Sequence, residues 1–152
     1  FKSFENTLSK FENEHGMANS RARLRMTTLY QVAAANSGIV VGTGNKVEDF
    51  GVGFYTKYGD GGVDISPIAD CNKTEVWELG KELGILDEII NAAPTDGLWD
   101  DGRTDEGQLG LSYQELEEAM ENPNSKNRSK YSEIRKMNLH KMEAIPVCKI
   151  PN

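Results

Sequence analysis

The sequence has 152 residues, a formal net charge of −7 and a hydrophobic fraction of 38%. This length corresponds to about one domain, and the negative charge disfavours a general nucleic-acid surface, which needs a basic patch. No apolar run approaches the roughly 18 residues that cross a bilayer. The first residues are polar and charged, unlike a signal peptide. We therefore expect a chain that binds neither nucleic acid nor membrane.

Cysteine and histidine are both scarce in the sequence. The two cysteines, Cys71 and Cys148, are far apart and form no CxxC motif. A disulfide framework is therefore not expected, and this cysteine usage favours a reducing cytoplasm. The two histidines, His15 and His140, are too few for a typical zinc site.

Two helices are predicted before residue 39. Residues 1–14 form the first, with an apolar stripe made of Phe1, Phe4, Leu8 and Phe11. We expect His15-Gly16 to break this helix and Asn19 or Ser20 to cap a second one. The second helix should end at Asn36-Ser37-Gly38. Its buried stripe should consist of Ala22, Met26, Leu29 and Ala33.

A short strand and a glycine-rich loop are predicted next. Residues 39–41 (Ile-Val-Val) are bounded by glycines and favour a buried strand. The loop that follows should contain a helical turn at 46–50. Residues 65–70 are expected to be extended, because the residue before Pro67 is pushed out of the helical region.

The rest of the chain is predicted to be mostly helical. Asn72-Lys73-Thr74-Glu75 resembles a capping box that opens a helix, and Gly84 should end that helix. A shorter helix is expected over 87–93 and an acidic loop over 95–110. Ser112 should cap a helix over 113–122. The last helix should span about 126–143, followed by an extended tail.

Helix, strand, loop and helix together suggest an α/β unit, yet only one strand is convincing. A parallel sheet needs several strands, and its crossover helices bury both faces. The chain also begins at Phe1 rather than Met, inside the first predicted helix. We therefore expect a piece of a longer protein, with the remaining strands before Phe1.

The glycines after the predicted strand do not match a known phosphate-binding loop. GTGNKVED superficially resembles a dinucleotide fingerprint, which needs G-x-G-x-x-G at the start of a helix. Val47 stands where the third glycine should be. A Walker loop, GxxxxGK(S/T), is also absent from the sequence. A classical dinucleotide-binding interpretation is therefore weak.

Longer motifs are more specific. RARLRM, VVGTGNKVEDFGVGFYTKYGDGG-D, PIADCNKTEVWELGKELGI, AAPTDGLWDDGRTDE and LHK occur in this order. From Ser20 onward the chain resembles the ammonia-dependent NAD synthetases, which are ATP-pyrophosphatase-type amidoligases. The resemblance implies a partial Rossmann-like, adenine-nucleotide-hydrolase-type three-layer fold, with one or two parallel strands in this chain. It also implies that residues 1–152 are the carboxyl-terminal portion of one catalytic domain.

The resemblance implies a reaction with two steps. ATP adenylates the nicotinate carboxylate of nicotinic acid adenine dinucleotide (deamido-NAD) and releases pyrophosphate, and ammonia then displaces AMP to form NAD. This chemistry requires that several phosphates are neutralised and that a metal ion, Mg²⁺ in this family, bridges the triphosphate. Members of the family are homodimers, so a homodimer is implied as well.

The resemblance also implies the residues that bind ATP and its metal. They are Thr43, Lys73 and Thr95 for ATP, and Glu48 for Mg²⁺, a cation that prefers carboxylate oxygen. Lys73 has an independent argument, because a lysine at a helix N-terminus is unfavourable unless an anion lies nearby. From the residues alone, Thr43 is an ordinary turn residue and Glu48 a solvated glutamate.

For deamido-NAD, the resemblance implies contacts from Arg23, Lys57, Asp64, His140 and Lys141. Two neighbouring arginines are not expected to contact deamido-NAD. Arg21 and Arg25 share one helix face, whereas Arg23 points nearly the other way. Arg21 and Arg25 are therefore expected to be structural ion-pair partners. The acidic residues of the later loop are expected to be solvated, and they are Asp96, Asp100, Asp101, Asp105 and Glu106.

The family's triphosphate-binding loop, SGGxDS, does not occur in these 152 residues. We therefore expect that the 152 residues alone do not catalyse the ligation. Two alternatives stay open. One is a related ATP-pyrophosphatase that modifies another acceptor, and the other is a catalytically dead nucleotide-binding or dimerisation module.

Overall fold

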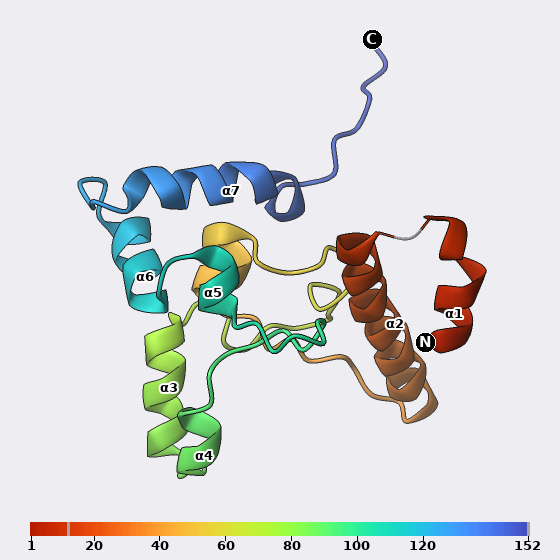
Figure 1. Cartoon of the computed structure of the whole chain (residues 1–152), viewed down its shortest axis with the longest axis horizontal. Coiled ribbons are helices and arrows are strands. Elements are labelled where there is room, and N and C mark those ends of the chain that lie inside the picture. Colours follow the sequence, from red (N-terminus) through yellow and green to blue (C-terminus); the bar gives the residue numbers. More distant parts are fainter. Residues whose placement is uncertain (12, 152) are drawn as a thin grey trace.

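The computed structural model describes residues 1–11 and 13–151 and is mostly helical (Figure 1). Helices α6 and α7 pack on the π-helix η2 and on each other, while α2 lies to one side of this cluster (Figure 1). In chain order the elements are α1 (Lys2–Thr7), the 3-10 turn η1 (Ser9–Phe11), α2 (Glu14–Ala35), η2 (Lys46–Val52), α3 (Lys73–Glu82), α4 (Asp87–Ile90), α5 (Asp105–Leu109), α6 (Tyr113–Glu121) and α7 (Arg128–Met142).

The start of α2 corrects two predictions. The expected helix over 1–14 is two short pieces, α1 and η1, and its residue Glu12 lies outside the described residues. The break expected at His15-Gly16 is wrong, because Asn13 caps α2 and its Oδ1 accepts a hydrogen bond from Gly16 N at 2.8 Å. First-turn N–H groups have no partner inside a helix, so this cap favours the earlier start. The caps expected at Asn19 or Ser20 are therefore also wrong, since both lie inside α2.

Helix α2 ends where predicted, with Asn36 as its C-cap. Its expected buried stripe is only partly buried. Ala22 is buried, whereas Leu29 has 55% of its surface exposed. The buried end of α2 faces the loop after η2, and Gly59 of that loop lies so close that a Cβ there would meet Ala22 Cβ at 2.8 Å. This end of the helix is thus held in part by a loop.

The predicted strand is extended but paired at one point. Val41 and Ile65 form an isolated parallel bridge, in which Gly42 N donates to Ile65 O at 2.7 Å. Val40 is buried, while Ile39 and Val41 are exposed. One or two full strands are therefore not confirmed within residues 1–11 and 13–151. The extended segment predicted over 65–70 is also shorter than expected, since a turn begins at Pro67.

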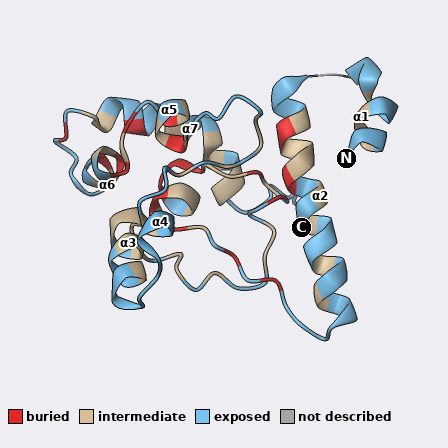
Figure 2. Ribbon diagram, turned by 60° about the horizontal axis from the view of Figure 1, so that its bottom comes forward, coloured by how far each residue is buried: buried red, intermediate tan, exposed pale blue. Residues whose placement is uncertain are grey.

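The hydrophobic core lies where η2, α5, α6 and α7 meet, as the buried residues in Figure 2 indicate. It consists of Val47, Val52, Leu109, Leu111, Tyr113, Leu116, Ala119 and Tyr131. Trp77 of α3 packs on it from outside, with its ring edge-to-face to Tyr113 at a centroid distance of 5.9 Å. Burying side chains of this size contributes about 1.5–3 kcal/mol each. The core therefore fixes η2 between α6 and α7.

The π-helix η2 is closed at both ends by specific groups. Asn45, 1% exposed, accepts hydrogen bonds from Val47 N and Glu48 N, both at 3.0 Å. Gly53 ends the element in a left-handed conformation with φ 66°, and Phe54 N donates to Glu48 O at 2.8 Å. The helical turn predicted at 46–50 is thus confirmed and continues to Val52.

Most later helices match their predictions. Ser112 caps α6 and accepts from Glu115 N at 3.2 Å, and Asn72 N donates to Glu75 Oε2 at 2.6 Å at the start of α3. Helix α4 is shorter than expected, and α5 lies inside the segment predicted as a loop. The tail has no helix or strand over 144–151, and its last residue, Asn152, lies outside the described residues. Within those residues no helix is long and apolar enough to cross a membrane.

Candidate functional site

A cavity of about 390 Å³ lies between the N-terminal half of α2, segment 54–60, loop 96–99 and the end of α7, and we call it the α2–α7 cavity. Four residues from the predicted set line it together, and they are Arg23, Lys57, His140 and Lys141. They come from three separate elements, α2, the loop after η2, and α7. The fifth residue, Asp64, lies outside this lining.

Arg23, Lys57 and His140 are linked through backbone oxygens. Arg23 Nε donates to Lys57 O at 3.2 Å, and Lys57 Nζ donates to His140 O at 2.7 Å. Each side chain is therefore oriented by a neutral carbonyl, and its positive charge is not cancelled by a carboxylate in these contacts. Lys57 also lies 5.7 Å from the Tyr58 ring centroid. The rim of the cavity thus presents two cationic groups to an anionic ligand.

Lys141 has a different role from Arg23 and Lys57. Its Nζ donates to Gly53 O at 2.9 Å and to Tyr55 O at 2.7 Å, while Tyr55 OH donates back to Lys141 O at 2.6 Å. Burial lowers the pKa of Lys141, and the charge of Asp60 partly opposes this. Lys141 therefore ties α7 to the segment after η2 and shapes the cavity floor.

Asp64 holds the extended segment rather than lining the cavity. Its Oδ2 accepts from Val40 N at 2.8 Å and its Oδ1 accepts from Tyr30 OH at 3.2 Å. It therefore connects the bridge region to α2. Of the five residues predicted to contact deamido-NAD, the structure brings four together at the cavity and places Asp64 outside its lining.

A second cavity of about 270 Å³ opens at the end of the extended segment, and we call it the strand-end cavity. Thr43 lines it, together with Gly42 and the glycine turn after Lys57. Asp60, Asp96 and Leu98 line both cavities, so the two spaces are neighbours. Asp60 is oriented by Thr56 N, which donates to its Oδ1 at 2.9 Å.

Glu48 and Lys73 form a partly buried pair. Lys73 Nζ lies 3.0 Å from Glu48 Oε1, and Tyr113 OH donates to the same oxygen at 2.5 Å. Tyr113 OH also lies 3.2 Å from Asp105 Oδ2, while Asp105 Oδ1 is buried with no hydrogen-bond partner. Burial, and the charge of Glu48, raise the pKa of Asp105, although its hydrogen bond with Tyr113 opposes this. Burial also raises the pKa of Tyr113.

We call Glu48, Lys73, Tyr113 and Asp105 together the Glu48 cluster. Its carboxylate oxygens are the donors that a hard cation prefers, but they are few. Within the described ranges, no group of three or more histidine, cysteine, aspartate or glutamate residues could hold a metal. Mg²⁺ often binds through one or two carboxylates plus substrate phosphates and water. The cluster therefore fits Mg²⁺ only in that mode. Asp105 was missed by the sequence prediction, which treated it as part of a solvated loop.

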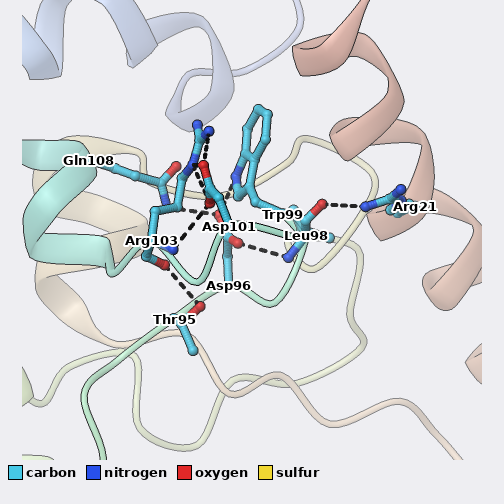
Figure 3. A network of polar contacts seen from close by, with 8 residues as sticks. All are labelled: Arg21, Thr95, Asp96, Leu98, Trp99, Asp101, Arg103 and Gln108. Atoms are coloured by element: carbon cyan, nitrogen blue, oxygen red, sulfur yellow. Dashed lines mark hydrogen bonds and ion pairs between the residues drawn. The ribbon is translucent and has the colours of Figure 1, made fainter.

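Loop 95–104 is organised around Asp96 (Figure 3). Its Oδ1 accepts from Leu98 N at 2.9 Å, and its Oδ2 accepts from Trp99 Nε1 at 3.2 Å and from Gln108 Nε2 at 3.1 Å. Thr95, a predicted ATP contact, donates to Arg103 O at 3.2 Å within the loop. The expectation of a merely solvated acidic loop is therefore wrong for Asp96, because short-range donors converge on it.

Two arginines of α2 hold this loop. Arg21 donates to Leu98 O at 2.7 Å (Figure 3) and lies 3.5 Å from Glu5 and 3.8 Å from Asp100, as an ion-pair partner should. Arg25 donates to Gly97 O at 2.9 Å, so it binds a carbonyl rather than forming the expected ion pair. Both side chains are structural.

Asp49→Asn is expected to raise the free energy of unfolding by about 1–2 kcal/mol at pH 8, because solvent screening of this partly exposed group reduces the effect of its charge, and to change it little at pH 4. Burial, followed by the charges of Glu48 and Asp60, raises the pKa of Asp49 to about 6. The folded state therefore holds this proton more tightly than the unfolded chain. The stability from Asp49 is present below about pH 4 and is lost as the pH rises to about 6.

Urea unfolding of both proteins at the two pH values measures this difference. Asp70→Asn is the control, because the Asp70 side chain is fully exposed. A gain for Asp49→Asn of the same size at pH 4 and pH 8 would show that burial of the charge is not its cause.

Comparison with known proteins identifies the class. The family model described as NAD synthase matches residues 1–151, and the chain therefore belongs to the NAD synthase family. It is 50% identical over 101 residues to the NH(3)-dependent NAD(+) synthetase of Carboxydothermus hydrogenoformans, covering 66% of this chain and 41% of that relative. It is 40% identical over 136 residues to the same enzyme of Finegoldia magna, covering 89% and 56%. The chain thus spans about half the length of these relatives.

Two solved structures are similar to this fold. The NMN synthetase of Francisella tularensis has a TM-score of 0.90 at 33% identity, covering 98% of this chain and 63% of that one. The NH3-dependent NAD synthetase of Campylobacter jejuni has a TM-score of 0.68 at 23% identity, covering 97% and 63%, and this likeness concerns the fold alone. The similarity to two synthetase structures confirms the type of fold expected from the sequence, but the one or two expected strands are not confirmed.

Proposed function

We propose that the chain is part of an NAD synthetase, which converts deamido-NAD to NAD with ATP and ammonia. The observation that carries this proposal is the convergence of Arg23, Lys57, His140 and Lys141 on the α2–α7 cavity. These residues come from distant parts of the sequence. Two of them present cationic groups that fit the diphosphate of a dinucleotide.

The chain's residues would divide between two ligands. Arg23 and Lys57 would neutralise the acceptor phosphates, while Lys141 keeps the cavity floor in place through Gly53 O and Tyr55 O. Asp64 would act from outside the cavity, by holding the extended segment that carries Thr43. Thr43 and Thr95 would contact ATP, Thr43 from the strand-end cavity next door. The shared wall between the cavities would bring the ATP phosphorus close to the acceptor carboxylate.

Glu48 is the residue that would hold Mg²⁺, with Lys73 beside it at 3.0 Å. When bound, the cation would neutralise triphosphate charge. Lys73 would then pair with a phosphate instead of Glu48, which agrees with its place in the first turn of α3. Asp105 lies close enough to share Tyr113 with Glu48 and would limit how far the Glu48 side chain can move.

The cellular setting is part of the proposal. Residues 1–152 would be the carboxyl-terminal portion of one synthetase domain, and the coverage of the relatives supports a portion of about half their length. The domain would work as a homodimer, and the exposed Leu29 and Val32 of α2 support a contact there. Cys71 and Cys148, both free, fit a cytoplasmic protein.

The test separates binding from turnover. The 152-residue chain is expected to bind deamido-NAD in calorimetry and to form no NAD with ATP, Mg²⁺ and ammonia. A chimaera in which the chain replaces the matching segment of the Finegoldia magna relative is expected to form NAD. Absence of binding in the chain together with an inactive, folded chimaera would refute the function. NAD formation by the chain alone would refute only the expected inactivity.

A second candidate is an NMN synthetase, which the TM-score of 0.90 and the 33% identity to that enzyme favour. Its acceptor, nicotinic acid mononucleotide, has the same pyridine carboxylate but lacks the adenylate half. Competition between the two acceptors in the chimaera decides between these functions. Preferential use of the mononucleotide would favour the second candidate.

A further inference from the structure

Trp99 forms one wall of the α2–α7 cavity, and this residue has no role in the function proposed above. It lies in loop 95–104, and its ring is only partly exposed. Tyr55 and Phe54, two other aromatic residues of the cavity, are already engaged. Tyr55 is tied to Lys141 by a hydrogen bond and packs against Gly61, while Phe54 packs on the hydrophobic core. Trp99 is therefore the large aromatic surface that a ligand can reach.

The orientation of Trp99 is fixed before any ligand binds. Its Nε1 donates to Asp96 Oδ2 at 3.2 Å, as Figure 3 shows, and the Arg103 guanidinium lies 4.0 Å from the ring centroid. Asp101 in turn pairs with Arg103 at 2.5 Å, which neutralises that cation. Arg21 anchors the same loop to α2 through Leu98 O. The indole is therefore already ordered in the fold, so that binding a ligand costs little side-chain conformational entropy at this residue.

The two faces of the indole differ. Arg103 and Trp99 together line a separate hollow that His15 does not reach, whereas His15 and Trp99 both line the α2–α7 cavity. The His15 and Trp99 rings are 28° from parallel, with centroids 6.3 Å apart. A planar ring placed between two others needs about 7 Å, twice the optimal carbon–carbon distance. His15 is exposed in the first turn of α2, so a small shift of its side chain opens this space.

We infer that Trp99 is a specificity-determining residue, whose cavity face receives the pyridinium ring of the acceptor. The inference rests on the proposed function. A pyridine ring bonded to ribose through nitrogen is positively charged, and tryptophan is the side chain that binds cations best through its ring face. The acceptor's phosphates are negative and are attracted to Arg23 and Lys57 on the same cavity. The positive ring of the acceptor would thus face the Trp99 wall, and its negative phosphates would face the cationic rim.

The same geometry gives Asp96 a positioning role. It receives both the Trp99 indole N–H and the Gln108 amide, so it sets the angle of the ring without contacting the acceptor's carboxylate. A negative residue at the edge of the ring also favours the approach of a cation. The arrangement selects an acceptor with a charged ring over a neutral base such as adenine.

Trp99 fluorescence provides a direct test. The chain has two tryptophans, so Trp77→Phe leaves Trp99 as the only reporter, and Trp77 lies outside the cavity. In this variant, deamido-NAD and nicotinic acid mononucleotide are both expected to quench the emission, while AMP does not. Trp99→Ala should weaken the binding of both acceptors about tenfold in calorimetry, and Trp99→Phe should restore most of the loss. ATP affinity should be unchanged.

The outcomes are distinct. If the unmodified chain binds deamido-NAD but saturation leaves Trp99 emission unchanged, or if Trp99→Ala binds it equally well, the inference fails and the proposed function stands. Quenching by AMP and not by the mononucleotide would assign the wall to adenine and overturn the inference. If the unmodified chain binds neither acceptor, the inference fails. If the folded chimaera is inactive as well, the proposed function fails with it.

Discussion

Gly53→Ala is expected to lower the free energy of unfolding by about 2–4 kcal/mol. Gly53 ends η2 with φ 66°, a conformation that costs residues with a Cβ about 1–2 kcal/mol. A Cβ at this position would also lie 2.7 Å from Asn138 Cβ and 3.3 Å from Asn138 O. Helix α7 would have to move, and with it Lys141, whose Nζ binds Gly53 O. The same substitution should therefore also widen the α2–α7 cavity.

Gly84→Ala is the matched control for this prediction. Gly84 follows α3 with φ 69°, nearly the same backbone conformation, but a Cβ at this position would meet nothing within 4 Å. It should lose only the conformational part, about 1 kcal/mol. Chemical unfolding of the two variants in one buffer gives the comparison. Equal losses would mean that contact with α7 is not the cause.

Local signals in the sequence predicted helices well where a cap and an apolar run agree. Ser112 and Asn72 begin their helices as expected, because each is followed three residues later by a glutamate whose side chain accepts a hydrogen bond from the N–H of the capping residue. The same reasoning failed near Asn13, where the glycine at position 16 suggested a break. The Asn13 cap satisfies the N–H of Gly16 directly, and this local bond outweighs the low helix propensity of glycine.

The strand prediction illustrates a different limit. Residues 39–41 have the composition of a buried strand, but pairing is a long-range property that one short segment does not determine. The single bridge between Val41 and Ile65 fixes where the segment lies without building a sheet. Helix α5 was missed for a related reason. Its sequence, DEGQL, is polar and short, and only Leu109 and Asp105 become buried through packing on the core.

The candidate site could be predicted residue by residue only through the resemblance to a family. Arg23, Lys57 and His140 meet because α2, the loop after η2 and α7 converge, and no spacing in the sequence encodes that convergence. Trp99 and Asp96 were missed because their importance lies in contacts made by Arg103 and Gln108. A glycine-rich acidic loop looks solvated until such partners are known.

Lys57→Gln is expected to weaken binding of deamido-NAD about tenfold to a hundredfold, and adding Arg23→Gln should weaken it further. Charge-assisted hydrogen bonds contribute about 1.5–3 kcal/mol, and Lys57 Nζ now donates only to a neutral carbonyl, His140 O. A phosphate is a stronger partner than this carbonyl, so the lysine gains on binding. The affinity of the unmodified chain should also fall as salt is added, because these charges are near the surface.

Lys46→Gln makes the same chemical change at a different place. Lys46 pairs with exposed Asp70 at 3.6 Å and does not line the α2–α7 cavity. Calorimetric titration of deamido-NAD should therefore give nearly the same dissociation constant for Lys46→Gln as for the unmodified chain, at every salt concentration. If both lysine variants lost affinity equally, the effect would reflect net charge alone. If neither did, the cationic rim would not be a phosphate site, and the acceptor would have to be held mainly by the aromatic wall.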